Sequence, residues 1–413
     1  MDFALGTGLL RRDAQGPAFS LDLQQAGLDS RLSFARASTA TDFVGGSLVT
    51  VVADSPRISA ANGLLIEESR TNSLRNSGTT GAVAGSSLPT NWMVEVSGGL
   101  TTAIVAVGTA NGFSYVRLRL SGTPTGTSWQ LRCESNSQIA ASSGQSWSAS
   151  LFHRLQAGGL SNISSIDLRV AELNSSATFL TASEAALVPV ANWTRALMTR
   201  TLSDTTCAYV NLRLRANLTV GAAVDVTLDI AAPQLELGAF ATSYIPTSGT
   251  AASRAPDLAS LTVGSWFNSA EGTFFAEALS GYGFDVAAAT SPRVLRCDGG
   301  STAYHEFRRN AADGVLRAGT NTANVSQSSL PGPVWAAQNL MRMAYTYNAN
   351  DMAFVATGAA LQTDSTSPDG MPACTTLRLG AVNSSSGFFN GWLRHVRYFN
   401  RRLQNDQLKA MTQ

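Results

Sequence analysis

The chain has 413 residues, of which 44% are hydrophobic and only 14% are charged, so it can bury substantial cores and lacks the composition of a disordered polyelectrolyte. Its net charge of +1 excludes the strongly positive field of a dedicated nucleic-acid binder. At roughly 100 to 200 residues per domain, the length predicts two to four domains.

The sequence shows no pattern typical of a metal site, a cofactor or a membrane span. The four cysteines lie far apart, without CxxC spacing, and the three histidines are scattered. No run of about 18 apolar residues occurs, and residues 1–12 lack the order of a secretory signal. We therefore expect no cofactor and no membrane contact, and synthesis in a bacterial cytoplasm. Asp285 and Asp298 are candidate calcium ligands, but without an EF-hand-like loop solvated acids are the preferred interpretation.

Short segments of alternating or β-branched residues, separated by Gly, Ser, Asn and Pro, fill almost the whole chain. This pattern predicts an all-β fold of tandem antiparallel jelly-roll or β-sandwich domains. Two small-residue stretches, 76–87 and 247–253, have the composition of linkers or loops. We therefore expect a small β-rich N-terminal attachment region at 1–75, a jelly roll at 76–253 and a sandwich at 254–413.

The N-terminal region contains charged residues of both signs, namely Arg36, Asp54, Arg57, Glu67, Glu68 and Arg70. These side chains can pair within a small β unit that docks to a shell protein or a partner subunit. They can equally well brace a domain junction, and the sequence does not decide between the two.

Alternation is clearest in the middle region, where each strand has an apolar side and a side of Tyr, Arg or Asp. The apolar positions predicted to face one core include Val116, Leu118, Val210, Leu212, Val226 and Leu228. The opposite side is either a saccharide platform, a solvated sheet with cross-strand Arg/Asp pairs, or a surface that packs on another subunit.

For the saccharide interpretation, aromatic and arginine side chains of the middle region are the candidates, because rings stack on sugars and guanidinium groups bind hydroxyls or carboxylates. The candidate residues are Tyr115, Arg117, Trp129, Trp147, Tyr209 and Arg213. Trp92 and Trp193, each following Asn, are interpreted as core residues at strand starts.

The last region also alternates, at 272–278 and 341–347, and ends with a strand at 392–399 and a short helix at 406–411. Its aromatic residues are a rival location for the sugar site. These are Tyr282, Tyr304, His305 and Trp335.

Particular strings resemble known families. The segment 389–403 with Leu408 is similar to the closing strand and helix of concanavalin A-like (laminin-G-like) jelly rolls, although Gln404 replaces the usual helix cap. Asn91-Trp92, Asn192-Trp193-Thr194 and 234–238 resemble carbohydrate-binding modules of the jelly-roll kind.

The strings at 32–41, 54–58, 63–72, 234–238, 241–247 and 254–257 resemble head-spike or fibre proteins of tailed phages and of phage-like gene transfer agents. The resemblance implies a virion surface protein that binds host capsular or cell-surface polysaccharide and mediates adsorption. It also implies attachment to capsid or other virion proteins through the N-terminal region. We expect a homo-oligomer, because several weak sugar sites on one particle multiply avidity.

An enzymatic role requires converging acids. Polysaccharide-degrading enzymes place two carboxylates about 5 to 10 Å apart, and the sequence shows neither a solenoid repeat nor a Glu-x-Asp-x-x-Glu strand. Isolated acids, such as Glu134, Glu172, Glu277 and Glu306, can still converge from distant strands. We expect a non-catalytic binder, with a glycoside hydrolase or lyase and a purely structural capsid or baseplate decoration as the alternatives.

Overall fold

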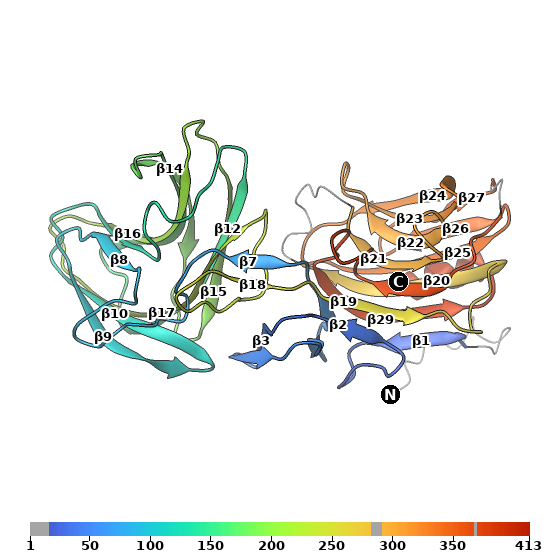
Figure 1. The fold of residues 1–413 in the computed structure, drawn as a ribbon, viewed down its shortest axis with the longest axis horizontal. Helices are drawn as coiled ribbons and strands as arrows, with labels where there is room; N and C mark the ends of the chain where they lie inside the picture. The colour runs from blue at the N-terminus through green and yellow to red at the C-terminus, as the bar shows by residue number, and fades with distance from the viewer. Residues whose placement is uncertain (1–15, 282–290, 367–369) are drawn as a thin grey trace. The chain divides into compact units, whose positions relative to one another are not determined.

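The computed structural model describes residues 16–281, 291–366 and 370–413. The chain divides into two compact units, and strands make up most of both (Figure 1). Unit 1 comprises Met1–Ala37, Ala53–Glu68 and Pro256–Gln413. Unit 2 comprises Ser38–Val52 and Ser69–Ala255. The all-β prediction is confirmed.

Within the described residues, unit 2 contains two large antiparallel sheets. The first, called the β10 sheet, has the order β15 (Thr194–Thr201), β12 (Ser146–Gly158), β17 (Val224–Leu237), β10 (Phe113–Gly122) and β9 (Thr101–Ala110). The second, called the β16 sheet, has the order β14 (Phe179–Leu187), β13 (Ile163–Leu173), β16 (Tyr209–Leu218), β11 (Ser128–Arg132) and β8 (Met93–Val96). Short pairs add β3 (Ala40–Val44) with β4 (Ser47–Val51), and β7 (Arg70–Asn72) with β18 (Ala252–Arg254).

The core of unit 2 lies between these two sheets. It includes all six residues that the alternation predicts to share one core: Val116, Leu118, Val210, Leu212, Val226 and Leu228. That prediction is confirmed. Because successive side chains of a strand point to opposite faces, the residues between these positions lie on the outer faces of the sandwich.

Unit 1 also contains two large antiparallel sheets within its described residues. The β20 sheet has the order β27 (Gln362–Asp364), β26 (Met352–Ala356), β25 (Leu340–Asn348), β20 (Glu271–Ser280), β29 (Gly391–Phe399), β6 (Gly63–Ile66) and β5 (Ile58–Ser59), with β1 (Phe19–Asp22) also pairing β29. The β22 sheet has the order β2 (Ser33–Ala35), β19 (Leu258–Thr262), β28 (Thr376–Leu379), β21 (Arg293–Asp298), β22 (Tyr304–Arg309), β23 (Val315–Thr322) and β24 (Val325–Val334).

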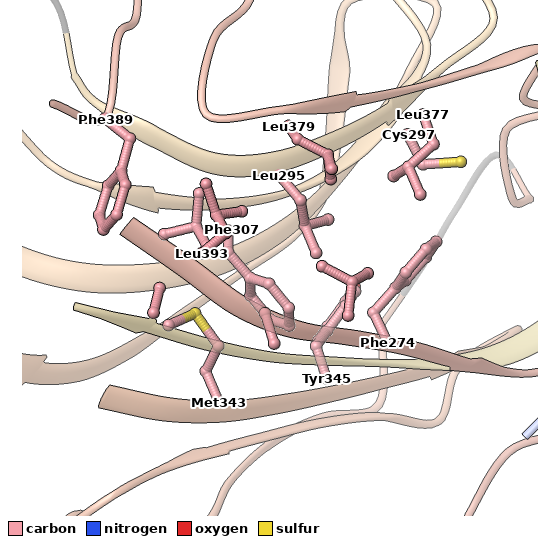
Figure 2. Close-up of a cluster of buried hydrophobic side chains, with 14 of the residues drawn as sticks. Phe274, Leu295, Cys297, Phe307, Met343, Tyr345, Leu377, Leu379, Phe389 and Leu393 are labelled. Atoms are coloured by element: carbon pink, nitrogen blue, oxygen red, sulfur yellow. The ribbon is translucent and has the colours of Figure 1, made fainter. Parts of the chain in front are cut away.

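The core of unit 1 is formed by the facing sides of these sheets. Figure 2 shows Phe274, Met343 and Tyr345 of the β20 sheet together with side chains of the β22 sheet such as Leu295 and Phe307. Helix α1 (Asn405–Thr412) follows β29, and Leu408 anchors it in a smaller cluster with Phe275 and Leu403.

The expected N-terminal region, residues 1–75, is not a third compact unit, and this division of the chain requires correction. Strands β1, β2, β5 and β6 complete the sheets of unit 1, whereas β3, β4 and β7 belong to unit 2. Phe19, Leu21 and Leu64 are almost fully buried in the unit 1 core. Residues 254–413 therefore lack parts of their own sheets when taken alone.

The stretch 76–87, which was expected to be a linker or loop, lies within unit 2, and its first residues are buried. Asn76 and Ser77 are buried, and the Ser77 hydroxyl lies 2.8 Å from the Tyr244 hydroxyl. The backbone N–H of Ser77 donates to Thr247 Oγ1 at 2.8 Å. Small polar residues are used here for close packing and hydrogen bonding, which composition alone does not separate from a flexible linker.

A buried imidazole in unit 1 leads to a pH prediction. His305 is fully buried, with Nδ1 2.7 Å from Thr320 Oγ1, and its ring stacks on Tyr347 at 4.0 Å between centroids. Burial lowers the pKa of His305 from 6.5 to about 3. The His305 imidazole of the folded protein is therefore neutral throughout the physiological pH range.

Between pH 6.5 and about 3 the unfolded chain binds a proton at His305 that the folded chain does not bind, so the free energy of unfolding falls as the pH falls. One such proton contributes up to about 1.4 kcal/mol per pH unit. We expect His305→Gln to show a shallower loss of stability than the wild-type chain in urea denaturation between about pH 7 and pH 4. Equal slopes for the two proteins would contradict this assignment.

Candidate functional site

The outer face of the β10 sheet brings together aromatic and charged side chains from several strands. Since Val116, Leu118 and Leu120 of β10 lie in the core, Tyr115 and Arg117 point to the outer face. Arg117 pairs in register with Asp229 of β17. The predicted residues Tyr115 and Arg117 therefore share one surface.

The ring of Tyr115 lies over Gly108 of the neighbouring strand β9. A Cβ atom built at Gly108 would lie 3.2 Å from the Tyr115 hydroxyl oxygen and 3.4 Å from two ring carbons. Because a glycine occupies this position, the phenol can rest against the sheet and remain half-buried. The guanidinium groups of Arg117 and Arg154 lie 5.4 and 5.8 Å from the centroid of this ring.

A second aromatic ring lies beside Tyr115. Trp193 directly precedes β15 and is half-buried, and its ring centroid is 6.3 Å from that of Tyr115. The Arg154 guanidinium lies over both rings, 4.5 Å from the Trp193 centroid and 5.8 Å from the Tyr115 centroid. The two rings and the cation form one continuous patch. Together with Arg117 and Asp229 we call it the Tyr115 patch.

One buried carboxylate fixes the two arginines of this patch. Asp229 is fully buried, and it accepts hydrogen bonds from Arg117 Nε at 2.7 Å and from Arg154 Nε at 2.8 Å. The Asp229 bridge raises the pKa of Arg117 by hydrogen bonding, so this guanidinium stays charged. Two cations around one anion leave the local charge positive.

At its end near Phe113 the same face is closed by an aromatic cluster. Phe113 and Phe152 lie 4.4 Å apart between centroids, and Phe43 of β3 packs on both rings. Leu48 of β4 packs on this cluster. This cluster supports Trp193, whose ring lies 4.9 Å from that of Phe113.

Trp129 and Trp147 do not belong to the patch, and their assignment as sugar-stacking residues is corrected. Trp129 is 1% exposed and Trp147 is 4% exposed, both within the core between the sheets. Trp129 Nε1 donates to Thr102 Oγ1 at 2.8 Å. Each tryptophan shares its strand side with an apolar neighbour, Leu131 or Ala149, so the alternation itself already indicated the core.

Tyr209 and Arg213 lie on β16, in the other sheet of the sandwich. Arg213 is 3% exposed, and its Nη1 lies 2.8 Å from Glu95 Oε2. Burial, with the positive charges of Arg169 and Arg132, lowers the pKa of Arg213. The six predicted residues therefore do not form one site: only Tyr115 and Arg117 lie in the Tyr115 patch.

Sequence reasoning placed Asp229 on this face without assigning it to the site, and it did not assign Arg154. The interpretation of Trp193 as a core residue is wrong, because its half-buried ring lies beside Tyr115. Trp193 stands outside any strand, so no alternation shows its direction. Arg154 lies between two register shifts of β12, at Ser150/Phe152 and Leu155/Ala157, and such bulges change which side a residue faces. Asp229 alternated visibly with apolar residues and was detectable as a partner for an outward-facing arginine.

The isolated acids considered for catalysis are each held by arginine. Glu134 accepts from Arg75 Nη2 at 2.7 Å, and Glu277 accepts from Arg342 Nε at 3.1 Å. Burial acts to raise the pKa of Glu172, but hydrogen bonds from Ser203, Asp204 and Arg200 lower it overall. Glu172, whose charged form is stabilised in this way, is therefore poorly suited to donate a proton as a general acid.

Among the described residues, no group of three or more His, Cys, Asp or Glu side chains is arranged to hold a metal ion. Asp298 accepts from Arg378 Nε at 2.9 Å, and Asp285 lies outside the described residues. In the same described ranges, no helix has both the length and the apolar character needed to cross a membrane.

The rival aromatic residues of unit 1 are separated by the structure. His305 and Trp335 are buried in the core, whereas Tyr304 is partly exposed on β22. Tyr282 lies outside the described residues. Trp92 is buried in the unit 2 core, as its sequence context predicts.

Comparison with known proteins finds only distant similarity. No protein-family model matches the chain, and no curated protein matches it either. Among solved structures, the chain is similar to the enzymatically active domain of tailspike protein 4 of bacteriophage CBA120, with 13% identity over 40% of this chain and 21% of that chain and a TM-score of 0.29. It is also similar to a CBM4 structure, with 16% identity over 40% of this chain and 99% of that chain and a TM-score of 0.27.

A further similar structure is the tripod from the baseplate of bacteriophage Tuc2009, with 11% identity over 78% of this chain, 99% of that chain and a TM-score of 0.30. The chain thus spans about a fifth of the tailspike chain that it matches. Because each of these TM-scores is below 0.5, the proposals below rest on the geometry and the sequence of this chain.

Proposed function

We propose that the Tyr115 patch binds polysaccharide. The observation that carries the proposal is the arrangement of two half-buried rings, Tyr115 and Trp193, on one sheet face with Arg154 beside both. Stacked rings and charge-assisted hydrogen bonds are the interactions by which a sugar gains free energy in water, since neutral hydrogen bonds are largely exchanged for those with solvent.

The patch is held ready for a ligand before binding. Gly108 lets Tyr115 lie flat, and Asp229 fixes the guanidinium groups of Arg117 and Arg154. Side chains that are already ordered lose less conformational entropy when a ligand arrives. The patch therefore contributes affinity without rearrangement of the sheet.

The face is long enough for more than one sugar ring. Tyr115, Arg117 and Arg119 follow each other on the outer side of β10, and Arg119 pairs with Asp225 at 2.8 Å. At about 3.3 Å per residue, the distance along the strand from Tyr115 to Arg119 is about 13 Å. A chain of sugars, rather than a single monosaccharide, is the proposed ligand.

We further propose that the protein is a non-catalytic spike or fibre on a virion surface that adsorbs the particle to host capsular or cell-surface polysaccharide. The resemblance of the strings at 32–41, 63–72 and 241–247 to phage spike proteins supports this role. Attachment to other virion proteins and assembly into a homo-oligomer belong to the same proposal. The arginine partners of Glu134, Glu172 and Glu277 favour binding over hydrolysis.

The test uses the full chain and a panel of purified bacterial capsular polysaccharides. For a polysaccharide that binds, Tyr115→Ala and Trp193→Ala are each expected to weaken binding by about 1–3 kcal/mol, or roughly 5- to 150-fold, because each removes a stacking ring. Affinity electrophoresis or calorimetry measures the change. Reducing ends are assayed in the same samples.

The matched control is Phe179→Ala, which removes a 43% exposed ring from the β16 sheet and is expected to leave the affinity unchanged. Full affinity in both patch variants, with their fold intact by circular dichroism, would show that the patch is not the binding site. Release of reducing ends that disappears on substitution of one glutamate would establish hydrolysis instead. Absence of binding to every polysaccharide would favour a structural decoration.

A further inference from the structure

A row of polar side chains crosses the outer face of the β22 sheet in unit 1. In strand register, Ser33 faces Ser260, Ser260 faces Arg378, Arg378 faces Arg296, and Arg296 faces Glu306. The neighbouring positions along these strands lie in the core, including Leu261, Leu377, Leu379, Leu295, Cys297 and Phe307. The row is therefore turned away from the core of the sandwich.

This face has more cations than anions. Arg293 Nε and Arg308 Nε each lie 3.3 Å from Glu306, and Arg378 Nε lies 2.9 Å from Asp298. Arg296 lies between the two acids, 3.7 Å from Glu306 and 3.6 Å from Asp298. Four arginines and two carboxylates give a local charge of 4 − 2 = +2.

The guanidinium groups of this face differ in how far they are exposed to solvent. Arg296 is 6% exposed, stacks on the Tyr304 ring at 3.7 Å and donates to Ser301 O at 3.0 Å. The side chains of Arg308 and Arg378 are 31% and 38% exposed. Each guanidinium has five N–H donors, so these two exposed groups keep donors for a further oxyanion.

A cavity of about 210 Å³ adjoins Arg378. Its polar lining is Arg378, Ser33, Ser260, Asn383 and Ser384, and its remaining lining is apolar. Pockets for drug-sized ligands begin at about 300 Å³, so this cavity fits one small ring-sized group. Hydroxyl and amide side chains beside an arginine provide partners for both hydroxyl groups and a carboxylate.

We propose that this face of unit 1 binds a carboxylate-bearing sugar, that is, a uronic acid residue of an acidic polysaccharide. The carboxylate of the ligand pairs with Arg378, and hydroxyl groups of the sugar reach Ser260 and Asn383, which line the same cavity. The site is separate from the Tyr115 patch in residues and in unit. It does not depend on the function proposed for that patch.

The small excess of charge favours a saccharide over a nucleic acid duplex. Duplex binding needs many phosphate contacts along a basic surface, and this face offers a local charge of +2 with acids interspersed. A planar guanidinium fork instead matches a single carboxylate in a bidentate manner.

The probe is a homogeneous oligogalacturonate, measured by calorimetry with the full chain at low ionic strength. Arg378→Gln is expected to weaken binding about tenfold, since it removes a charge-assisted contact. Arg378→Lys keeps the charge but not the fork and is expected to restore binding only in part. The matched control is Arg31→Gln, an exposed arginine of unit 1 that pairs with Asp29 and is expected to bind as the wild type does.

Ser384→Trp supplies a second, independent variant, because it fills the cavity from an exposed loop without removing a charge. It is expected to weaken oligogalacturonate binding also. Retained affinity in Arg378→Gln and Ser384→Trp would overturn the site. Equal losses in Arg31→Gln would overturn it in favour of general attraction of polyanions. So would binding of dextran sulfate and duplex DNA as tight as that of oligogalacturonate.

Substitutions at the two sites are expected to affect the binding of different polysaccharides. Tyr115→Ala is expected to leave oligogalacturonate affinity unchanged, and Arg378→Gln is expected to leave the affinity for a neutral polysaccharide unchanged. If Tyr115→Ala abolishes oligogalacturonate binding, the acidic sugar binds in unit 2 and this proposal fails.

Discussion

Replacing Asp257 by alanine is expected to lower the free energy of unfolding of unit 1 by about 3–5 kcal/mol, because it removes the shared partner of two buried cations. Asp257 Oδ2 lies 2.5 Å from Arg57 Nη2, and Asp257 Oδ1 lies 3.1 Å from Arg36 Nη1. All three side chains are fully buried. The backbone N–H of Glu67 also donates to Asp257 Oδ2 at 2.9 Å.

The measurement is chemical denaturation of the full chain, followed by a probe that reports on unit 1. The matched control is Asp225→Ala, which breaks the Arg119 pair on the surface of unit 2, where both side chains are about half exposed. This control is expected to change stability little, because exposed ion pairs are screened by water. A loss for Asp257→Ala no larger than that of the control would contradict the role of the buried network.

The same network shows what the charged residues of the N-terminal region do within the chain. Arg36, Arg57 and Glu67 are buried around Asp257 in unit 1. These residues therefore stabilise unit 1 from within, and attachment to other virion proteins stays a proposal. Arg70 is buried in unit 2, where its guanidinium lies 4.4 Å from the Phe240 ring centroid.

Local patterns predicted the class of fold and the core but not the division of the chain. Alternation over a few residues shows which side chains of a strand share a face, so Val116, Leu118 and Leu212 were assigned to the core correctly. The pairing of β1 with β29 joins segments more than 300 residues apart. No local period contains that information, and the N-terminal strands were therefore grouped into a region of their own.

The sequence predicted only some of the residues of the candidate site. Tyr115 and Arg117 were found because β10 alternates without interruption between them. Trp193 and Arg154 were missed, because one precedes its strand and the other lies between two bulges of β12. The alternation of β10 shows that Tyr115 and Arg117 face outward, whereas the identity of their neighbours depends on which strands pair.

The two tryptophans Trp129 and Trp193 are expected to give opposite results on substitution by alanine. Trp129 fills the core between the sheets at 1% exposure, and its loss is expected to cost about 3–5 kcal/mol of unit 2 stability through lost burial and the cavity left behind. Trp193 is half-buried on the outer face, so its loss is expected to have a smaller effect on stability.

Polysaccharide affinity is expected to follow the reverse order. Below its unfolding transition, Trp129→Ala keeps the outer face of the β10 sheet and is expected to bind as the wild type does, whereas Trp193→Ala stays folded and loses affinity. If Trp129→Ala does not fold, Trp129→Phe gives a milder version of the same comparison, measured by thermal unfolding and by affinity electrophoresis. A folded Trp129 variant that loses affinity as strongly as Trp193→Ala would contradict the placement of the site on the outer face. The loss would show that polysaccharide binding requires the core around Trp129.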